Sequence, residues 1–210
     1  MKRLALGCLI LSSVCLAGET RHPALFLEKG KLFSAEEFAG ESLPKSIELR
    51  SGSTGVASNG VLTVVNGTVD ENPTARPVIH YNEVADEFIC HMRLKMDGQG
   101  YTKSPWIDVG GQHRNHFRFN DREVLFSSEA KPLAERRIDN RRSGNMLPLN
   151  EWLHVTVEIK KGKIGLSING RTEIYEDGKI EIGDSLKIGM KAIPGGEFHV
   201  DYVRIWEVKK

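Results

Sequence analysis

The sequence has little cysteine, almost no charge imbalance and no long apolar run, and each of these features excludes a class of protein. Only 3 cysteines occur in 210 residues, and Cys8 and Cys15 both lie in the apolar N-terminal segment. Cys90 is then the single cysteine of the remainder, which excludes an intrachain disulfide and indicates a small core residue. The 29 basic residues nearly equal the 28 acidic ones, so no nucleic-acid partner is expected.

Residues 1–17 have the pattern of a secretory signal peptide. Two basic residues precede a short apolar run over residues 4–16, and Ala17 offers a small residue for cleavage. The run is too short to span a bilayer, so we expect an exported, periplasmic or extracellular protein with no membrane span. Cleavage leaves 27 basic and 28 acidic residues, a net charge of −1. Lipidation of Cys15 is the disfavoured alternative, because residues 12–14 match poorly what usually precedes a lipidated cysteine.

The rest of the chain alternates apolar and polar residues with a period of two, without a long helical period or an internal repeat. Residues 151–175 contain three such runs, and Asn169-Gly170 between the second and third is typical of a type I′ hairpin turn. A phase switch near Asp201-Tyr202 predicts a β-bulge. Further strands are expected at 32–33, 61–65, 77–81, 88–96, 106–109, 116–119, 122–126, 186–190 and 197–208.

This pattern predicts an all-β, two-sheet antiparallel sandwich. Residues 18–30 are interpreted as a linker and residues 31–210 as one domain.

Three motifs carry a resemblance to a known family: EWLHV at 151–155, IGLSING at 164–170 and VDYVRIW at 200–206. They resemble concanavalin A-like jelly-roll domains and, more narrowly, the exported bacterial domain-of-unknown-function 1080 group, also called the 3-keto-disaccharide hydrolase domain. The likeness spans about residues 31 to 208 and implies a jelly roll of the lectin/glucanase type with a carbohydrate-related role. Members proposed to be enzymes cleave glycosidic bonds in sugars oxidised at the 3-position. Residues 107–124 depart from the polar signatures of those members, so catalysis stays open.

Candidate site residues are polar or aromatic groups on the predicted strand faces and their loops. Sugar recognition needs planar hydrogen-bonding side chains beside an aromatic platform. Asp108 and His116 are the candidate catalytic pair. The candidate ligand-binding residues, expected on a polar concave face, are His91, Arg93, Trp106, Gln112, His113, Asn115 and Arg118.

The alternative interpretation is that these residues form the solvated faces of strands. A hairpin turning at Asn120-Asp121 would place Phe117 opposite Val124 and pair Arg118 with Glu123. Asp201 is expected to hydrogen-bond the local backbone.

No cofactor motif is evident, since phosphate-binding loops and dinucleotide fingerprints are missing. Asp108, His113 and His116 would need a further ligand from elsewhere to hold a metal, so no metal ligands are assigned. A divalent metal such as calcium stays open as a structural ion, although no Asp-rich loop indicates one.

Three functions remain for the sequence. The first is an exported carbohydrate-binding jelly roll that takes an oligosaccharide or glycan. The second is a hydrolase of 3-keto-disaccharides or related glycosides. The third is a structural or interaction module of the cell envelope.

Overall fold

The computed structural model describes residues 22–40, 42–45, 47–50, 53–65, 78–81, 84–97, 104–110, 115–119, 123–128, 137–139, 150–178, 180, 182–183, 185–191 and 197–210. This part of the chain forms two antiparallel sheets and contains no helix. It therefore holds no helix that could cross a membrane. The predicted signal peptide lies outside the described residues, as do Gln112 and His113.

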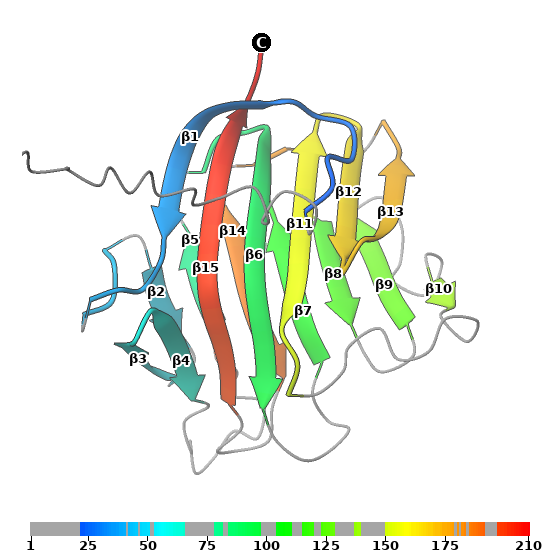
Figure 1. The fold of residues 1–210 in the computed structure, drawn as a ribbon. Coiled ribbons are helices and arrows are strands. Elements are labelled where there is room, and N and C mark those ends of the chain that lie inside the picture. The colour runs from blue at the N-terminus through cyan, green and yellow to red at the C-terminus, as the bar shows by residue number, and fades with distance from the viewer. Residues whose placement is uncertain are drawn as a thin grey trace, which may run out of the picture.

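The first sheet, sheet A, has eight strands and forms the front layer in Figure 1. Its order is β13-β12-β11-β6-β15-β4-β3, and β1 also pairs with β15. The strands are β1 (Lys29–Glu36), β3 (Thr54–Ser58), β4 (Val61–Val65), β6 (Phe88–Asp97), β11 (Leu153–Lys160), β12 (Lys163–Ile168), β13 (Arg171–Glu176) and β15 (Glu197–Val208).

The second sheet, sheet B, has seven strands in the order β10-β9-β8-β7-β14-β5-β2 and lies behind the first (Figure 1). Its strands are β2 (Ile47–Arg50), β5 (Val78–Tyr81), β7 (Ser104–Val109), β8 (Asn115–Phe119), β9 (Glu123–Ser128), β10 (Arg137–Asp139) and β14 (Leu186–Lys191). The predicted all-β, two-sheet antiparallel jelly-roll sandwich is thus confirmed.

The hydrophobic core lies between the two sheets. Alternate residues of β11 in sheet A, such as Val157 and Ile159, join alternate residues of sheet B, such as Ile107 and Ile188, in one buried cluster. Cys90 is a free thiol within this cluster, as predicted. Because strand side chains alternate between faces, the remaining residues of each strand lie on its outer face, turned away from the other sheet.

Two turn and bulge predictions are confirmed by backbone geometry. Asn169 and Gly170 have φ angles of 49° and 82°, as a type I′ turn between β12 and β13 requires. The register of β15 against β6 shifts between Val200 and Tyr202, which is the predicted bulge.

The predicted hairpin register between β8 and β9 is wrong by two residues. Phe117 pairs with Phe126 rather than Val124, and Arg118 pairs with Leu125 rather than Glu123. The physical reason is a longer connection, since Phe119 and Val124 are the last paired residues of the hairpin. A shift of two keeps every side chain on its predicted face, so Phe117 and Phe126 still meet in the core, with ring centroids 4.9 Å apart.

Candidate functional site

Five polar residues follow one another across the outer face of sheet B. They are Glu48, His80, Lys187, Asp108 and His116, from β2, β5, β14, β7 and β8 in turn. Each is paired in register with the next: Glu48 with His80, His80 with Lys187, Lys187 with Asp108, and Asp108 with His116. We refer to these five residues as the polar row.

The polar row is unusual because two of its members are buried although they lie on an outer face. Asp108 is 1% exposed and His80 is 6% exposed. His80 Nδ1 lies 3.7 Å from Glu48 Oε2, and the Glu48 side chain is half exposed. Burying a carboxylate and an imidazole costs free energy that apolar residues would not cost. We therefore take the polar row as the candidate site.

A second row on the same face places an aromatic residue beside Asp108. Trp106 pairs with Arg118 on one side and with Gly189 on the other. A Cβ atom on Gly189 would overlap the Trp106 indole, so the ring lies directly over this glycine. The indole is 7% exposed. An indole held flat on a sheet next to a carboxylate gives an apolar surface beside a hydrogen-bonding group, the combination typical of small-molecule sites.

Four of the predicted site residues belong to these two rows: Asp108, His116, Trp106 and Arg118. The predicted catalytic pair, Asp108 and His116, occupies directly opposed positions of β7 and β8. Asn115 is placed differently, because it pairs with the core residue Val109 and donates its Nδ2 to the Val109 carbonyl at 3.3 Å. Asn115 therefore lies on the core side of the sheet, at the end of β8.

His91 and Arg93 lie on the outer face of sheet A, on the opposite side of the sandwich from the polar row. They alternate with Cys90 and Met92, which are in the core. The core separates them from Asp108, so the predicted residues do not form one site. Arg93 instead donates a hydrogen bond to Asp201 Oδ2 at 2.6 Å, and its guanidinium lies 4.6 Å from the centre of the Trp152 ring. Asp201, which was expected to hydrogen-bond the local backbone, thus forms a cross-strand ion pair with Arg93.

The segment before β1, which was expected to be a linker, packs on sheet A beside His91. The Glu158 carboxylate accepts hydrogen bonds from the backbone amides of Leu25, Phe26 and Leu27, each at 2.8 Å. Glu158 is 1% exposed, and a buried carboxylate is stabilised by several backbone donors of this kind. We refer to His22–Leu27 as the docked segment.

His22 anchors the other end of the docked segment through its ring. Nδ1 lies 3.0 Å from Thr156 Oγ1 and Nε2 lies 2.6 Å from Tyr202 Oη. The ring stacks on His91, with centroids 4.3 Å apart. Burial, then the positive charges of His154, Lys29 and Arg204, lower the pKa of His22 to about 4.

The same causes keep His91 neutral. Burial, followed by the charges of His22, Lys29 and Arg204, lowers the pKa of His91 to about 2. His91 and the docked segment line a cavity of about 460 Å³ together with Ile89 and Lys209. The stacked imidazoles are both uncharged near neutral pH, so they pack as aromatic rings.

Hydrolysis by two carboxylates requires a second acid about 5–9.5 Å from the first. Among the described residues on the outer face of sheet B, Glu48 and Asp139 are each three strands from β7. At about 4.8 Å per strand, Glu48 lies roughly 14 Å from Asp108. Asp139 pairs with Glu123 and is therefore also displaced four residues along the strands, so it lies roughly 20 Å away. Glu123 is two strands away and four residues before Ser127, which pairs with His116, so it lies about 16 Å away. None of these three acids has the spacing of a glycosidase pair with Asp108.

Sequence reasoning missed Lys187 and Glu48 in the polar row. These residues come from short strands whose neighbours are distant in sequence, so no local pattern could group them. The docked segment was missed too. One signal was available for it: Glu158 is an acidic residue inside a strand rich in Val and Ile.

The described fold resembles glycan-cleaving enzymes of known structure. The laminarinase catalytic domain of Thermotoga maritima MSB8 superposes with a TM-score of 0.65 at 10% identity, covering 87% of this chain and 100% of that one. The endo-β-1,3-glucanase of Pyrococcus furiosus gives 0.60 at 12% identity, covering 86% and 95%. The GlcNAcα1-4Gal-releasing endo-β-galactosidase of Clostridium perfringens gives 0.58 at 15% identity, covering 88% and 65%.

No family model matches the chain, and no curated protein is significantly similar to it in sequence. The narrower assignment to the domain-of-unknown-function 1080 group therefore stays a prediction. Identities of 10–15% establish a shared fold and nothing finer. The chain therefore has the two-sheet jelly-roll fold of these glucanases and of the endo-β-galactosidase.

Proposed function

We propose that this chain is an exported jelly-roll protein that binds a saccharide on the outer face of sheet B. The observation that carries the proposal is the polar row beside Trp106. It places a buried carboxylate, a buried imidazole and a lysine at adjacent register positions, next to an indole on the same face. Hydroxyl groups of a sugar need such donors and acceptors, while the apolar face of its ring needs an aromatic surface.

In this proposal each described residue has a separate role. Asp108 accepts hydrogen bonds from sugar hydroxyls, and Lys187, its register partner, donates to sugar oxygens. Trp106 packs against the ring face. His116 and Arg118 occupy the next strand and extend the site toward β9. The likeness to laminarinases and to an endo-β-galactosidase supports an extended glycan as the ligand class.

A second candidate is hydrolysis of 3-keto-disaccharides or related glycosides. The observation in its favour is the opposed register of Asp108 and His116, which could move a proton between them. The lack of a second acid at glycosidase spacing among the described residues favours binding over this alternative. Both candidates place the ligand on the outer face of sheet B. One assay that measures both glycan binding and product release therefore distinguishes them.

The test is calorimetric titration of the mature chain with β-1,3-gluco-oligosaccharides, galactose-containing mucin glycans and 3-keto-glycosides, with product analysis by chromatography. We expect binding of at least one glycan without product release. Asp108→Asn should weaken that binding by about 10–100-fold, because hydrogen bonds to a charged group contribute about 1.5–3 kcal/mol. Glu173→Gln on β13 of sheet A is the matched control and should bind normally.

Turnover that is lost in Asp108→Asn would replace the binding proposal by the hydrolase. The absence of both binding and turnover across the panel would favour the third candidate, a module of the cell envelope. Export is tested separately: secretion with cleavage near Ala17 is expected, and retention of residues 1–17 on the mature chain would contradict it.

A further inference from the structure

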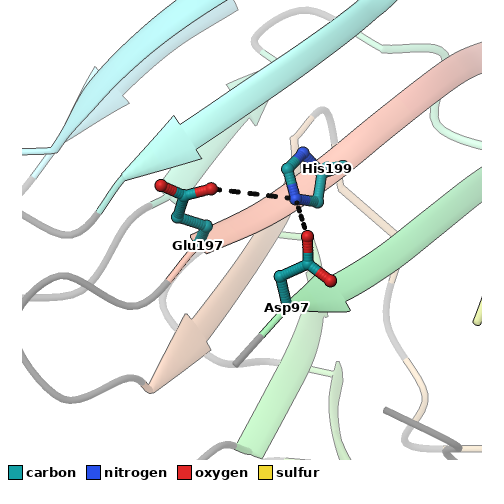
Figure 2. Close-up of side chains that lie close together, drawn as sticks. All are labelled: Asp97, Glu197 and His199. Atoms are coloured by element: carbon teal, nitrogen blue, oxygen red, sulfur yellow. Dashed lines mark hydrogen bonds and ion pairs between the residues drawn. The ribbon is translucent and has the colours of Figure 1, made fainter. Parts of the chain in front are cut away.

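Three side chains that can bind metal gather where β6 ends and β15 begins, on the outer face of sheet A (Figure 2). Asp97 is the last residue of β6 and pairs in register with Glu197, the first residue of β15. His199 follows on the same face of β15. One donor atom from each residue lies within 4.8 Å of the others. His199 Nε2 is 2.8 Å from Asp97 Oδ2 and 3.9 Å from Glu197 Oε2.

The orientation of the His199 ring is set from its other side. His199 Nδ1 lies 3.0 Å from Thr63 Oγ1, and Thr63 is the register partner of His199 on β4. A hydrogen bond to the second ring nitrogen is the usual support of a metal-binding histidine, because it holds the ring and its tautomer in place. Here it directs Nε2 toward both carboxylates. The three ligands and their support all stand on paired strands, which position side chains more firmly than loops do.

The charge of this group favours a cation. Asp97 and Glu197 supply two negative charges around one imidazole. Lys95 offsets one of them, because its Nζ lies 3.2 Å from Asp97 Oδ2. One negative charge remains, and the two carboxylates repel each other at adjacent positions of an antiparallel pair. A divalent cation between them would reverse that repulsion.

We propose that Asp97, Glu197 and His199 bind a zinc ion that fastens the end of β6 to the start of β15. One imidazole nitrogen and two carboxylate oxygens are typical zinc ligands, whereas calcium takes oxygen ligands almost exclusively. Three protein ligands leave a fourth position for water. The site lies on the opposite sheet from the polar row, so the result is independent of whether a saccharide binds there.

The test is titration of tag-free, chelator-treated full-length mature chain with zinc chloride, followed by calorimetry and thermal melting. We expect one zinc per chain with a micromolar or tighter Kd. At a free zinc concentration of about 100 Kd, Tm should rise by roughly 5–10 °C. His199→Gln should weaken binding by more than ~100-fold and abolish this rise. Thr63→Val, which removes only the support of the ring, should weaken binding by about 10–100-fold.

Two further variants separate a metal site from an ion-pair network. Lys95→Met removes the charge that competes for Asp97, so zinc should bind at least as tightly as in the natural chain. Glu197→Gln changes the more exposed ligand and should weaken binding without unfolding the protein. Circular dichroism and Tm in chelator identify any variant that has failed to fold.

His154→Gln is the matched control, because His154 lies near His22 and His91 in a second histidine cluster on the same sheet. This variant should bind zinc normally. The proposal is overturned if the natural chain binds no zinc at 1 mM, if His154→Gln rather than His199→Gln abolishes binding, or if Glu197→Gln and His199→Gln bind as tightly as the natural chain.

Discussion

Mild acidification should release the docked segment from sheet A. The pKa of His22 is lowered from 6.5 to about 4 when its ring lies between Thr156 and Tyr202. In the released segment the ring is solvated and has its ordinary pKa, so the released form binds more protons between pH 4 and pH 6.5. The docking free energy that depends on neutral His22 is complete above pH 6.5 and is lost as the pH falls toward 4.

The size of the effect follows from the two pKa values. The full shift corresponds to about 3 kcal/mol. Between pH 7 and pH 5.5, above the range in which ordinary carboxylates titrate, the loss is about 1.2 kcal/mol, or close to an eightfold change in the docking equilibrium. His91 acts in the same direction, because burial, followed by the charges of His22, Lys29 and Arg204, lowers its pKa to about 2. Protonation of either histidine therefore favours the released segment.

Amide hydrogen exchange measures this opening directly. The amides of Leu25, Phe26 and Leu27 are bound to Glu158 only while the segment is docked. Their protection, corrected for intrinsic exchange rates, should fall by about eightfold from pH 7 to pH 5.5. His22→Gln retains hydrogen-bonding groups without titrating and should show a smaller fall. Protection that stays within twofold across this range in the natural chain would show that protonation of His22 does not release the segment.

Three further predictions concern packing and the docked segment. Glu158→Gln removes the charged acceptor of three backbone amides, so exchange protection of those amides should fall by at least ~10-fold at every pH. Gly189→Ala places a methyl group in the Trp106 indole, and overpacking of about 1–3 kcal/mol should lower Tm by several degrees. The double variant with Trp106→Ala should recover part of that loss. Phe117→Ala empties a fully buried core position and should cost about 3–5 kcal/mol in urea unfolding.

The strands could be predicted because each depends on a local pattern. The predicted strand 61–65 coincides with β4, and the three strands between residues 151 and 175 have the predicted faces and turn. These segments alternate cleanly, and Asn169-Gly170 leaves one turn geometry. The β8–β9 register failed because the length of a hairpin connection is a weaker signal than the phase of the strands beside it.

The candidate site could be predicted only in part, because the pairing of strands that are distant in sequence leaves no local sequence pattern. The strands β7 and β8 are neighbours in the sheet and follow one another in the chain. The sequence could therefore predict that their residues Trp106, Asp108, His116 and Arg118 lie together. Lys187 enters the same row from a strand some 80 residues later. His91 shares residue type and phase with these groups but lies on the other sheet, which no pattern within β6 reveals.

Tryptophan fluorescence reports directly on whether a saccharide binds beside Trp106, as proposed. The chain has 3 tryptophans, and Trp152→Phe with Trp206→Phe leaves Trp106 as the sole emitter. Titration with the glycan identified by calorimetry should change this emission with the calorimetric Kd. The Trp106→Phe variant, which keeps only the two tryptophans of the other sheet, should show no change. Emission that responds only in Trp106→Phe would place the ligand on sheet A and contradict the claim.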